Sequence, residues 1–213
     1  MKIALIGATG YVGSHIRDEA LSRNHEVTAI VRHPEKLPVR ANLAPRQADV
    51  LDVDSLAKVL AGHDAVISAF SAERDSPDKY ADHVAGAKAI IAATKQAGVK
   101  RLLVVGGAGS LEIAPGQQMI DQPDFPAEWK AGAGGTREFL YLLKNEPDLD
   151  WTFLSPAAMF EPGERTGKFR LGGDQLLVDE KGECRISLPD YAVAMIDELE
   201  QPQHIRKRFC VAY

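Results

Sequence analysis

The sequence is poor in cysteine and contains no long apolar run. Its two cysteines, Cys184 and Cys210, form neither a metal-ligand spacing nor a CxxC redox motif. We therefore expect two reduced, packed thiols and no metal site. No apolar segment approaches the length that spans a bilayer, and the first residues read as a folded strand instead of a signal peptide. These absences predict a soluble cytoplasmic protein without a membrane partner.

Basic charge is also scarce. The 213 residues contain 25 Lys and Arg against 30 Asp and Glu, which leaves a formal net charge of −5. A nucleic-acid-binding surface needs a basic patch, so we expect no nucleic-acid partner. The length suits one domain with a substantial core, and we expect residues 1–213 to form a single domain. The sequence leaves open whether the protein is a monomer or a homodimer.

Glycine, by contrast, is concentrated directly behind the first predicted strand. Residues 2–6 read as a buried strand, and Gly7-Ala8-Thr9-Gly10-Tyr11-Val12-Gly13 follows before a helix. In this context Gly7 lets the chain leave the strand tightly, Gly10 lets a pyrophosphate approach the backbone, and Gly13 lets the helix lie close to the sheet. The helix directs its free N–H groups at the phosphates. We predict a dinucleotide-binding site at this turn.

Strand and helix patterns alternate along the rest of the chain. Such alternation predicts an α/β fold with a Rossmann-like, doubly wound parallel sheet and helices on both faces. The predicted strand order is 3-2-1-4-5-6. The strands are expected at 2–6, 26–31, near 45–48, 64–70, 101–105 and 151–154, and the helices at 54–60, 79–97 and 135–144.

The residues at helix ends support this division, and a small C-terminal elaboration follows the sixth strand. Asp54 is placed to cap the helix at 54–60. Ser187 and Asp190 are placed as a capping box for a helix that runs to about residue 200. Residues 206–211 have the pattern of a further strand.

Two segments interrupt the alternation. Residues 113–130 contain three prolines and two aromatic residues, and residues 161–183 are rich in glycine and charge, with a strand-like patch at 175–178. Both follow the carboxyl ends of strands, which is the edge where such sheets bind ligands. We therefore predict substrate-pocket loops at 109–132 and 157–183.

The end of the second strand indicates which nicotinamide cofactor fits. NAD-specific proteins of this fold place Asp or Glu there to bind the ribose 2′-hydroxyl, whereas this chain has Arg32. Arginine pairs with a 2′-phosphate through charge-assisted hydrogen bonds, and Lys36 adds a second positive charge. The negative charge of the nearby Glu35 partly counteracts these two cations. NADP(H) is therefore predicted over NAD(H). Asp49, after the third strand, is placed either to accept a hydrogen bond from the adenine amino group, which we favour, or to cap the local turn.

Several segments together resemble one group of proteins: GATGYVGSHI, VTAIVRHPEKLP, ADVLD, DAVISAF and GVKRLLVVGGAGSL. They are similar to atypical short-chain dehydrogenase/reductases with an NAD(P)H-binding domain, namely the bacterial NADH-flavin reductases and, more distantly, biliverdin-IXβ reductase/flavin reductase. RTGKFRLGGDQLLVDEKG and ISLPDYAVAMIDELE extend the likeness over most of the chain. The resemblance implies contacts at the pyrophosphate by Gly7, Thr9, Gly10, Tyr11 and Val12, at the 2′-phosphate by Arg32 and Lys36, at the adenine by Asp49 and Val50, at the nicotinamide ribose by Ala69 and Phe70, and around the nicotinamide by Gly106, Gly107, Pro156, Ala157 and Ala158.

The catalytic residues of these relatives are missing from the sequence. Conventional short-chain dehydrogenases use Tyr and Lys of a YxxxK motif beside a Ser that ends strand five, and no YxxxK occurs here. The nearest match, Tyr141 to Lys144, is one residue short, which turns the two side chains to different angles on a helix. Gly107 stands at the strand-five Ser position, with Ser110 displaced from it, and residues 156–158 stand where biliverdin reductases carry His. The catalytic residues therefore stay unassigned.

A cofactor site without a positioned acid favours an acceptor that needs only hydride. Reducing a ketone requires a proton donor at the developing alkoxide, whereas a reduced flavin or quinone takes its proton from water. We therefore expect an NADPH-dependent reductase of a planar acceptor. The alternatives are a non-catalytic NADP(H) sensor and a sugar-nucleotide epimerase or dehydratase. Some side chains are placed either to line the acceptor site or to pack in the core, of which packing is the commoner role; they are Tyr80, His83, Phe125, Trp129 and Phe160. His83 is not expected to be catalytic.

Overall fold

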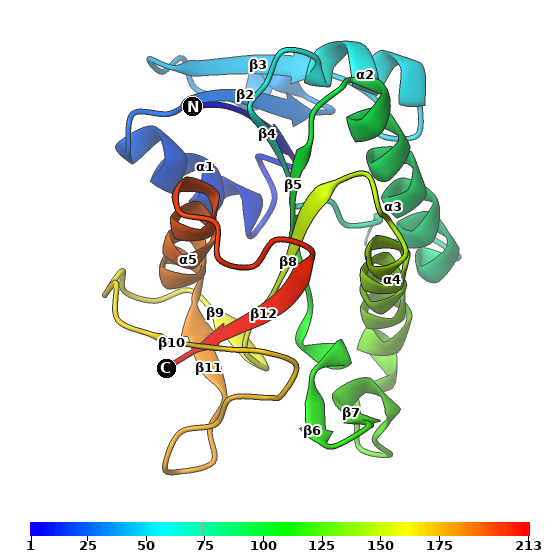
Figure 1. Cartoon of the computed structure of the whole chain (residues 1–213), viewed down its shortest axis with the longest axis vertical. Coiled ribbons are helices and arrows are strands. Elements are labelled where there is room, and N and C mark those ends of the chain that lie inside the picture. Colours follow the sequence, from blue (N-terminus) through cyan, green and yellow to red (C-terminus); the bar gives the residue numbers. More distant parts are fainter. Residues whose placement is uncertain (74) are drawn as a thin grey trace.

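The computed structural model describes residues 1–73 and 75–213, and its central feature is a sheet in the order β10-β12-β8-β5-β4-β1-β2-β3 (Figure 1). All neighbouring strands are parallel except β10, which runs antiparallel to β12. The order β3-β2-β1-β4-β5-β8 confirms the predicted 3-2-1-4-5-6, so the fold is Rossmann-like. The strands are β1 (Lys2–Ile6), β2 (Glu26–Val31), β3 (Leu43–Gln47), β4 (Ala65–Ser68), β5 (Arg101–Val105), β8 (Asp150–Ser155), β10 (Arg170–Gly172) and β12 (Lys207–Ala212).

Helices cover both faces of this sheet, as predicted. Figure 1 shows α1 and α5 on one face and α2, α3 and α4 on the other. Alternate residues of each buried strand point to opposite faces, so the sheet supplies two apolar cores. Leu154 of β8 packs in the core under α1 and α5, whereas Phe153 packs in the core under α2 to α4. The helices are α1 (Gly13–Ser22), α2 (Val53–Leu60), α3 (Lys79–Gln96), α4 (Ala127–Lys144) and α5 (Leu188–Glu200).

The two irregular segments contain more regular structure than the sequence predicts. A short hairpin of β6 (Glu112–Ala114) and β7 (Gln117–Gln118) follows β5, and α4 begins eight residues before the expected position 135. The expected strand at 175–178 is absent from the described residues, where Gln175 makes a single bridge to Glu112. The remaining elements are β9 (Met159–Glu161), β11 (Arg185–Ser187), η1 (Pro34–Lys36), η2 (Ala108–Ser110) and η3 (Met119–Asp121).

Helix capping corrects two expectations. Asp52, and not Asp54, caps α2, because its Oδ1 accepts a hydrogen bond from the Ser55 N–H at 3.0 Å. Ser187 caps α5 as predicted, with its Oγ accepting from the Asp190 N–H at 3.1 Å. The capping box is not completed, because the Asp190 carboxylate accepts hydrogen bonds from another segment of the chain, described below.

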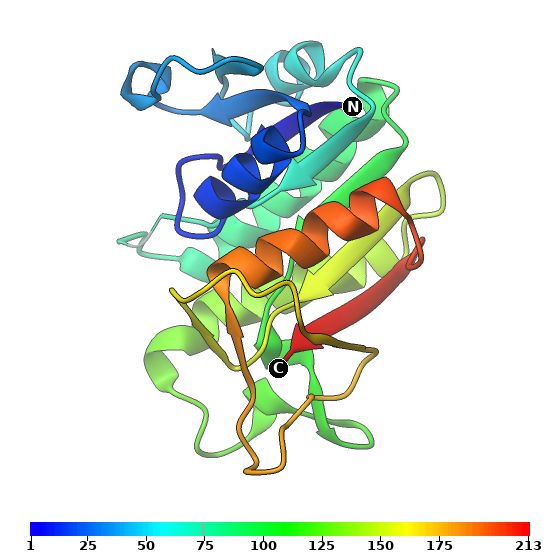
Figure 2. The same ribbon diagram turned by 90° about the vertical axis from the view of Figure 1, so that its left-hand side faces the viewer.

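The strand predicted at residues 206–211 is confirmed as β12, which extends the parallel sheet beyond β8. Cys184 and Cys210 are both buried, free thiols, as expected. No helix in the described part of the chain is long and apolar enough to cross a membrane. Figure 2 shows the carboxyl edge of the sheet on its left, where the glycine-rich turn, the segment after β4 and the start of α4 lie along one side of the molecule.

Candidate functional site

The glycine-rich turn is shaped by two positions that have no room for a side chain. Gly7 has a φ of 78°, and a Cβ there would lie 2.5 Å from the carbonyl oxygen of Ala69, the residue directly after the neighbouring strand β4. A Cβ on Gly13 would lie 2.1 Å from the Gly7 carbonyl oxygen. A Cβ on Gly10 would meet only that same oxygen, at 3.3 Å, so its outer side is open. The turn is therefore compact toward the protein and accessible toward a ligand.

The helix that follows this turn offers uncapped N–H groups. α1 begins at Gly13 with no side-chain cap, whereas Asp52, Asp78 and Ser187 cap α2, α3 and α5. An uncapped helix start fits an anionic group. Arg17 stabilises the turn, because its guanidinium donates a hydrogen bond to the Ala8 carbonyl oxygen at 3.2 Å. The remaining predicted pyrophosphate contacts are accessible at this edge: Thr9 and Tyr11 are exposed and Val12 is half-buried.

The end of β2 carries the predicted 2′-phosphate residues on its surface. Arg32 is exposed and forms an ion pair with Glu73, which lies in the segment between β4 and α3. The Arg32 carbonyl oxygen accepts a hydrogen bond from Gln47 Nε2, at the end of β3, at 3.0 Å. Lys36 is exposed on η1, and Glu35 pairs with His33 at 3.2 Å.

No local pattern in the sequence connects Glu73 with Arg32, because 41 residues separate the two, so this pairing could not be predicted.

At the end of β3, the structure favours the local role of Asp49. Its Oδ1 accepts a hydrogen bond from the Leu51 N–H at 2.9 Å, which caps the turn. Its side chain is exposed, while Val50 is half-buried against the core under α2 to α4. The turn-capping alternative is therefore present in the structure, and an adenine contact by Asp49 remains a prediction.

The ends of β4 and β5 approach α3 and α4 closely. The Phe70 ring turns away from the edge and packs on α3, where a Cβ on Gly86 would lie 2.2 Å from it. Its ring centroid is 5.6 Å from that of His83. A Cβ on Gly106 would lie 2.3 Å from the Phe153 ring, and one on Gly107 would lie 3.3 Å from the Thr136 methyl group. The Phe70 ring is therefore engaged in packing on α3, and only its backbone is left for the predicted contact with a nicotinamide ribose.

The segment after β8 is only partly accessible. Pro156 and Ala157 are buried, whereas Ala158 is exposed. The Ala158 N–H donates to Cys184 Sγ at 3.2 Å, which ties this segment to the residue before β11. Contact with a ligand through side chains is thus limited to Ala158 among these three.

The side chains considered as neighbours of an acceptor differ in their exposure. Tyr80 and Trp129 are exposed on the first turns of α3 and α4, and the half-buried Phe125 lies near Gly109. Phe160 takes the packing role, because its ring lies against Tyr191 in the core under α1 and α5, with ring centroids 4.7 Å apart.

His83 is buried and not part of an open wall. Its Nε2 lies 3.5 Å from Thr136 Oγ1, and its Nδ1 has no hydrogen-bond partner among the described residues. Burial lowers the pKa of His83 to about 4, with a contribution from Lys79. The imidazole is therefore neutral at physiological pH and cannot serve as a proton donor through a charged form.

No tyrosine–lysine acid pair forms on α4 within the described residues. Tyr141 Oη donates to Gln118 Oε1 at 3.2 Å beside β7, and Lys144 is exposed at the last position of α4. Ser110 is buried and contacts Arg208 of β12 through its carbonyl and hydroxyl oxygens, at 3.3 and 3.4 Å. The expectation that these residues do not reproduce a conventional dehydrogenase site agrees with this geometry.

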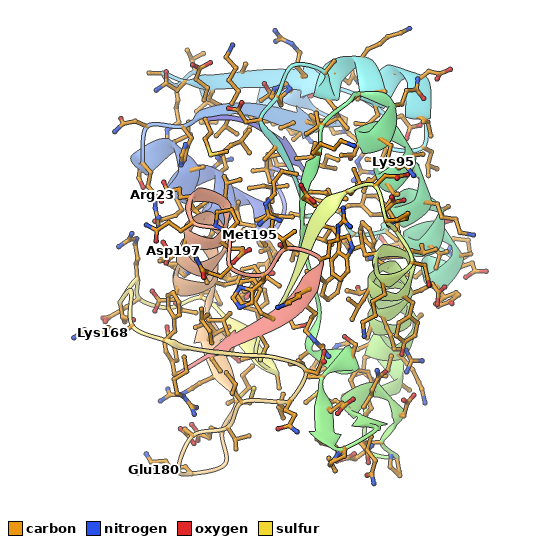
Figure 3. The ribbon with its side chains drawn as sticks, viewed as in Figure 1. Arg23, Lys95, Lys168, Glu180, Met195 and Asp197 are labelled. Carbon is orange, nitrogen blue, oxygen red and sulfur yellow. The ribbon has the colours of Figure 1, made fainter. Side chains whose placement is uncertain are left out.

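A hollow lies away from the glycine-rich turn, on the side of α5. It has a volume of about 520 Å³, is open to solvent, and is lined by β9, β11, Tyr213 and the segment between β9 and β10, residues 162–169, which we call the strap. Arg165 of the strap donates to both carboxylate oxygens of the buried Glu19, each at 2.8 Å. Figure 3 shows Lys168 of the strap projecting from the molecule, and Arg23, directly after α1, beside Asp197 of α5.

Asp190 holds the strap at a second point. Its buried carboxylate accepts hydrogen bonds from the N–H groups of Thr166 and Gly167, each at 2.8 Å. It also accepts from Tyr213 Oη at 2.8 Å. The sequence predicts Asp190 as part of a capping box, and only the tertiary contacts reveal this anchoring role.

Across residues 1–73 and 75–213, no three His, Cys, Asp or Glu side chains gather as metal ligands.

Residues 7–202 match the protein family described as NAD(P)H-binding. YwnB of Bacillus subtilis is 44% identical over 214 residues, which covers 99% of this chain and 98% of YwnB.

Two solved structures extend the likeness over the whole chain. A "putative epimerase" from Bacteroides thetaiotaomicron is 48% identical with a TM-score of 0.94, covering 100% of this chain and 96% of the other. A "putative NADH-flavin reductase" from Streptococcus pneumoniae is 39% identical with a TM-score of 0.87, covering 100% and 99%.

Proposed function

The chain belongs to the NAD(P)H-binding family, and from this premise we propose that it is an NADPH-dependent oxidoreductase that transfers hydride to a planar acceptor such as a flavin or a quinone. The observation that carries this proposal is the combination of an open glycine-rich turn before an uncapped helix with an edge that lacks a Tyr–Lys acid pair among the described residues. The name of the Streptococcus pneumoniae relative supports the choice of acceptor.

The cofactor would lie along the carboxyl edge of the sheet. When bound, its reduced nicotinamide supplies the hydride. The glycine-rich turn and the start of α1 would hold the pyrophosphate, and Ala69, Gly106 and Gly107 would pass close to the nicotinamide end because they have little or no side chain. The residues we propose as cofactor contacts are Gly7, Thr9, Gly10, Tyr11, Val12, Arg32, Lys36, Asp49, Val50, Ala69, Phe70, Gly106, Gly107, Pro156, Ala157 and Ala158.

The preference for NADPH rests on Arg32 and Lys36. Both side chains are exposed at the end of β2, where a nicotinamide dinucleotide presents its adenosine ribose. Two cations there favour a 2′-phosphate over a hydroxyl. We place the whole chain, residues 1–213, in this one cofactor-binding domain, and we place the activity in the cytoplasm, which suits the two free cysteines.

The chemistry at the acceptor follows from the side chains at the edge. A ketone would need a donor at the developing alkoxide, and His83 is neutral and buried while Tyr141 is engaged with Gln118 beside β7. A flavin or quinone needs only alignment over the cofactor, because its proton comes from water. Tyr80, Phe125 and Trp129 are the accessible or half-buried rings on the α3 and α4 side that we propose to flank it.

Two other functions share this edge. A sensor would bind NADP(H) without turnover, and an epimerase, the name given to the Bacteroides thetaiotaomicron relative, would oxidise and reduce its own substrate. The missing YxxxK motif speaks against the epimerase.

The first experiment mixes purified protein with FMN or a small naphthoquinone and follows the loss of absorbance of NADPH, with NADH in parallel. Saturable oxidation that prefers NADPH supports the reductase. Binding without oxidation supports the sensor and contradicts our proposal. Arg32→Ala is expected to lower the affinity for NADPH about tenfold or more and to change the affinity for NADH little. Arg185→Ala, which changes an exposed arginine on β11, is expected to change neither affinity.

A further inference from the structure

The ion pair of Arg32 and Glu73 connects two loops on either side of the glycine-rich turn. β1 pairs with β2 on one side and with β4 on the other. Arg32 directly follows β2, and Glu73 follows β4 by five residues. A contact between these two loops must pass in front of the end of β1, where Gly7 opens the turn. Figure 2 shows the segment after β4 at the same edge as that turn.

Both partners are free to exchange this contact for another. The side chains of Arg32 and Glu73 are 72% and 68% exposed, and among the described residues neither has a second ionic partner. Ion pairs this exposed are weak, so a ligand with more charge can replace the carboxylate. The backbone on each side is better held: Gln47 donates to the Arg32 carbonyl oxygen, and the Ser76 N–H donates to the Glu73 carbonyl oxygen at 3.3 Å.

We propose that Glu73 is a specificity-determining residue that competes with the 2′-phosphate of NADPH for Arg32. This inference rests on the proposed binding of NADPH at this edge. In the structure the Glu73 carboxylate takes the position of an anionic partner of Arg32. A 2′-phosphate has more charge and more acceptor oxygens, so it displaces the carboxylate from the guanidinium. Glu73 then lies beside an anion of like charge, which lowers the affinity for NADPH.

The same carboxylate acts in the opposite direction on NADH. A ribose 2′-hydroxyl donates a hydrogen bond to an acidic side chain, which is how NAD-specific sites of this fold recognise it. Glu73, near Arg32, supplies such an acceptor from the β4 loop although β2 itself ends in arginine. Specificity is a difference of two affinities, and Glu73 reduces that difference from both sides. The protein is therefore expected to accept both cofactors, with a moderate preference for NADPH.

The test measures dissociation constants of NADPH and NADH, and of the fragments 2′,5′-ADP and 5′-AMP, for Glu73→Gln. We expect NADPH and 2′,5′-ADP to bind about fivefold more tightly, and NADH about twofold more weakly, as the loss of one weak pair and one like charge predicts. Glu35→Gln is the matched control, since it removes the same charge from a residue that pairs with His33 and not with Arg32, and we expect a smaller gain in NADPH affinity from it. Thermal melting of each variant checks folding.

The outcomes separate this inference from the proposed function. If Arg32→Ala weakens NADPH but Glu73→Gln leaves it unchanged, or if Glu35→Gln has the same effect as Glu73→Gln, the role of Glu73 is overturned and the NADPH site stands. If Arg32→Ala leaves both cofactors unchanged, the proposed 2′-phosphate site itself fails. In the double variant Arg32→Ala/Glu73→Gln, we expect most of the gain in NADPH affinity from Glu73→Gln to disappear. The reason is that this variant has no Arg32 guanidinium for which Glu73 and the 2′-phosphate could compete.

Discussion

Gly13 places α1 against the glycine-rich turn, and a methyl group is enough to disturb this contact. A Cβ at this position would lie 2.1 Å from the Gly7 carbonyl oxygen, which is backbone and cannot rotate away. We expect Gly13→Ala to lower the free energy of unfolding by about 1–3 kcal/mol, as overpacking does. We also expect it to lower the affinity for NADPH about tenfold or more. Urea unfolding and fluorescence titration measure the two effects. Gly173→Ala is the control, because nothing lies within 4 Å of its Cβ, and an equal loss there would contradict the steric explanation.

His83 makes stability depend on pH in the mildly acidic range. Burial, together with Lys79, lowers its pKa from 6.5 in the unfolded chain to about 4 in the folded protein. The unfolded state therefore binds the proton more tightly, so stability is complete above pH 6.5 and falls as pH drops from 6.5 toward 4, by about 3 kcal/mol. His83→Gln is expected to remove this component from the unfolding free energy measured by urea at pH 7.5, 6, 5 and 4.5. The exposed His33→Gln is expected to retain it.

The strap is a loop held in place by two buried carboxylates, Glu19 on α1 and Asp190 on α5. Glu19→Gln weakens the bonds from Arg165 and Arg23, and we expect a loss of about 1–3 kcal/mol together with faster proteolytic cleavage within residues 162–169. Arg165→Gln should cost less than about 1 kcal/mol, because Arg165 is half exposed.

The pH dependence of this anchor has a defined sign. Hydrogen bonds from Arg165, and then the charge and hydrogen bond of Arg23, hold the pKa of Glu19 below 4.5. Its stabilisation is therefore present above about pH 4.5 and is lost as pH falls through the lowered pKa. Strap cleavage should increase in that acidic range in the wild type and change little in Glu19→Gln. Asp18→Asn, on the exposed side of α1, is expected to behave as the wild type.

At the scale of the whole molecule, the buried carboxylate of Glu198 connects two parts of the fold that are far apart in the sequence. It accepts from Arg101 of β5 at 3.0 Å and from His204, just before β12, at 2.8 Å, so it links the centre of the sheet to its C-terminal addition. Glu198→Ala leaves the Arg101 guanidinium buried without its partner, which costs about 3 kcal/mol or more and lowers the melting temperature by roughly 10 °C. Calorimetry is expected to show one transition that shifts as a unit. A separate early transition would contradict our placement of residues 1–213 in one domain.

Local patterns were enough to predict most of the parallel sheet. The strands, their order from β3 to β8, and the steric roles of Gly7 and Gly13 are confirmed, because a strand, a turn and the start of a helix depend on residues a few positions apart. Errors occurred where two local choices were almost equivalent. Asp52 and Asp54 are both plausible caps, and the prolines before α4 hid the true start of that helix at Ala127.

The candidate site divides in the same way. The glycine-rich turn, the cation at the end of β2 and the missing acid motif all follow from the sequence by itself, since each depends on residue type at a fixed distance from a strand end. The pairing of Arg32 with Glu73, the packing of Phe160 on Tyr191 and the two anchors of the strap were decided only by the tertiary structure. These contacts join residues tens of positions apart, and which of many possible partners meet is determined by how the helices and strands pack.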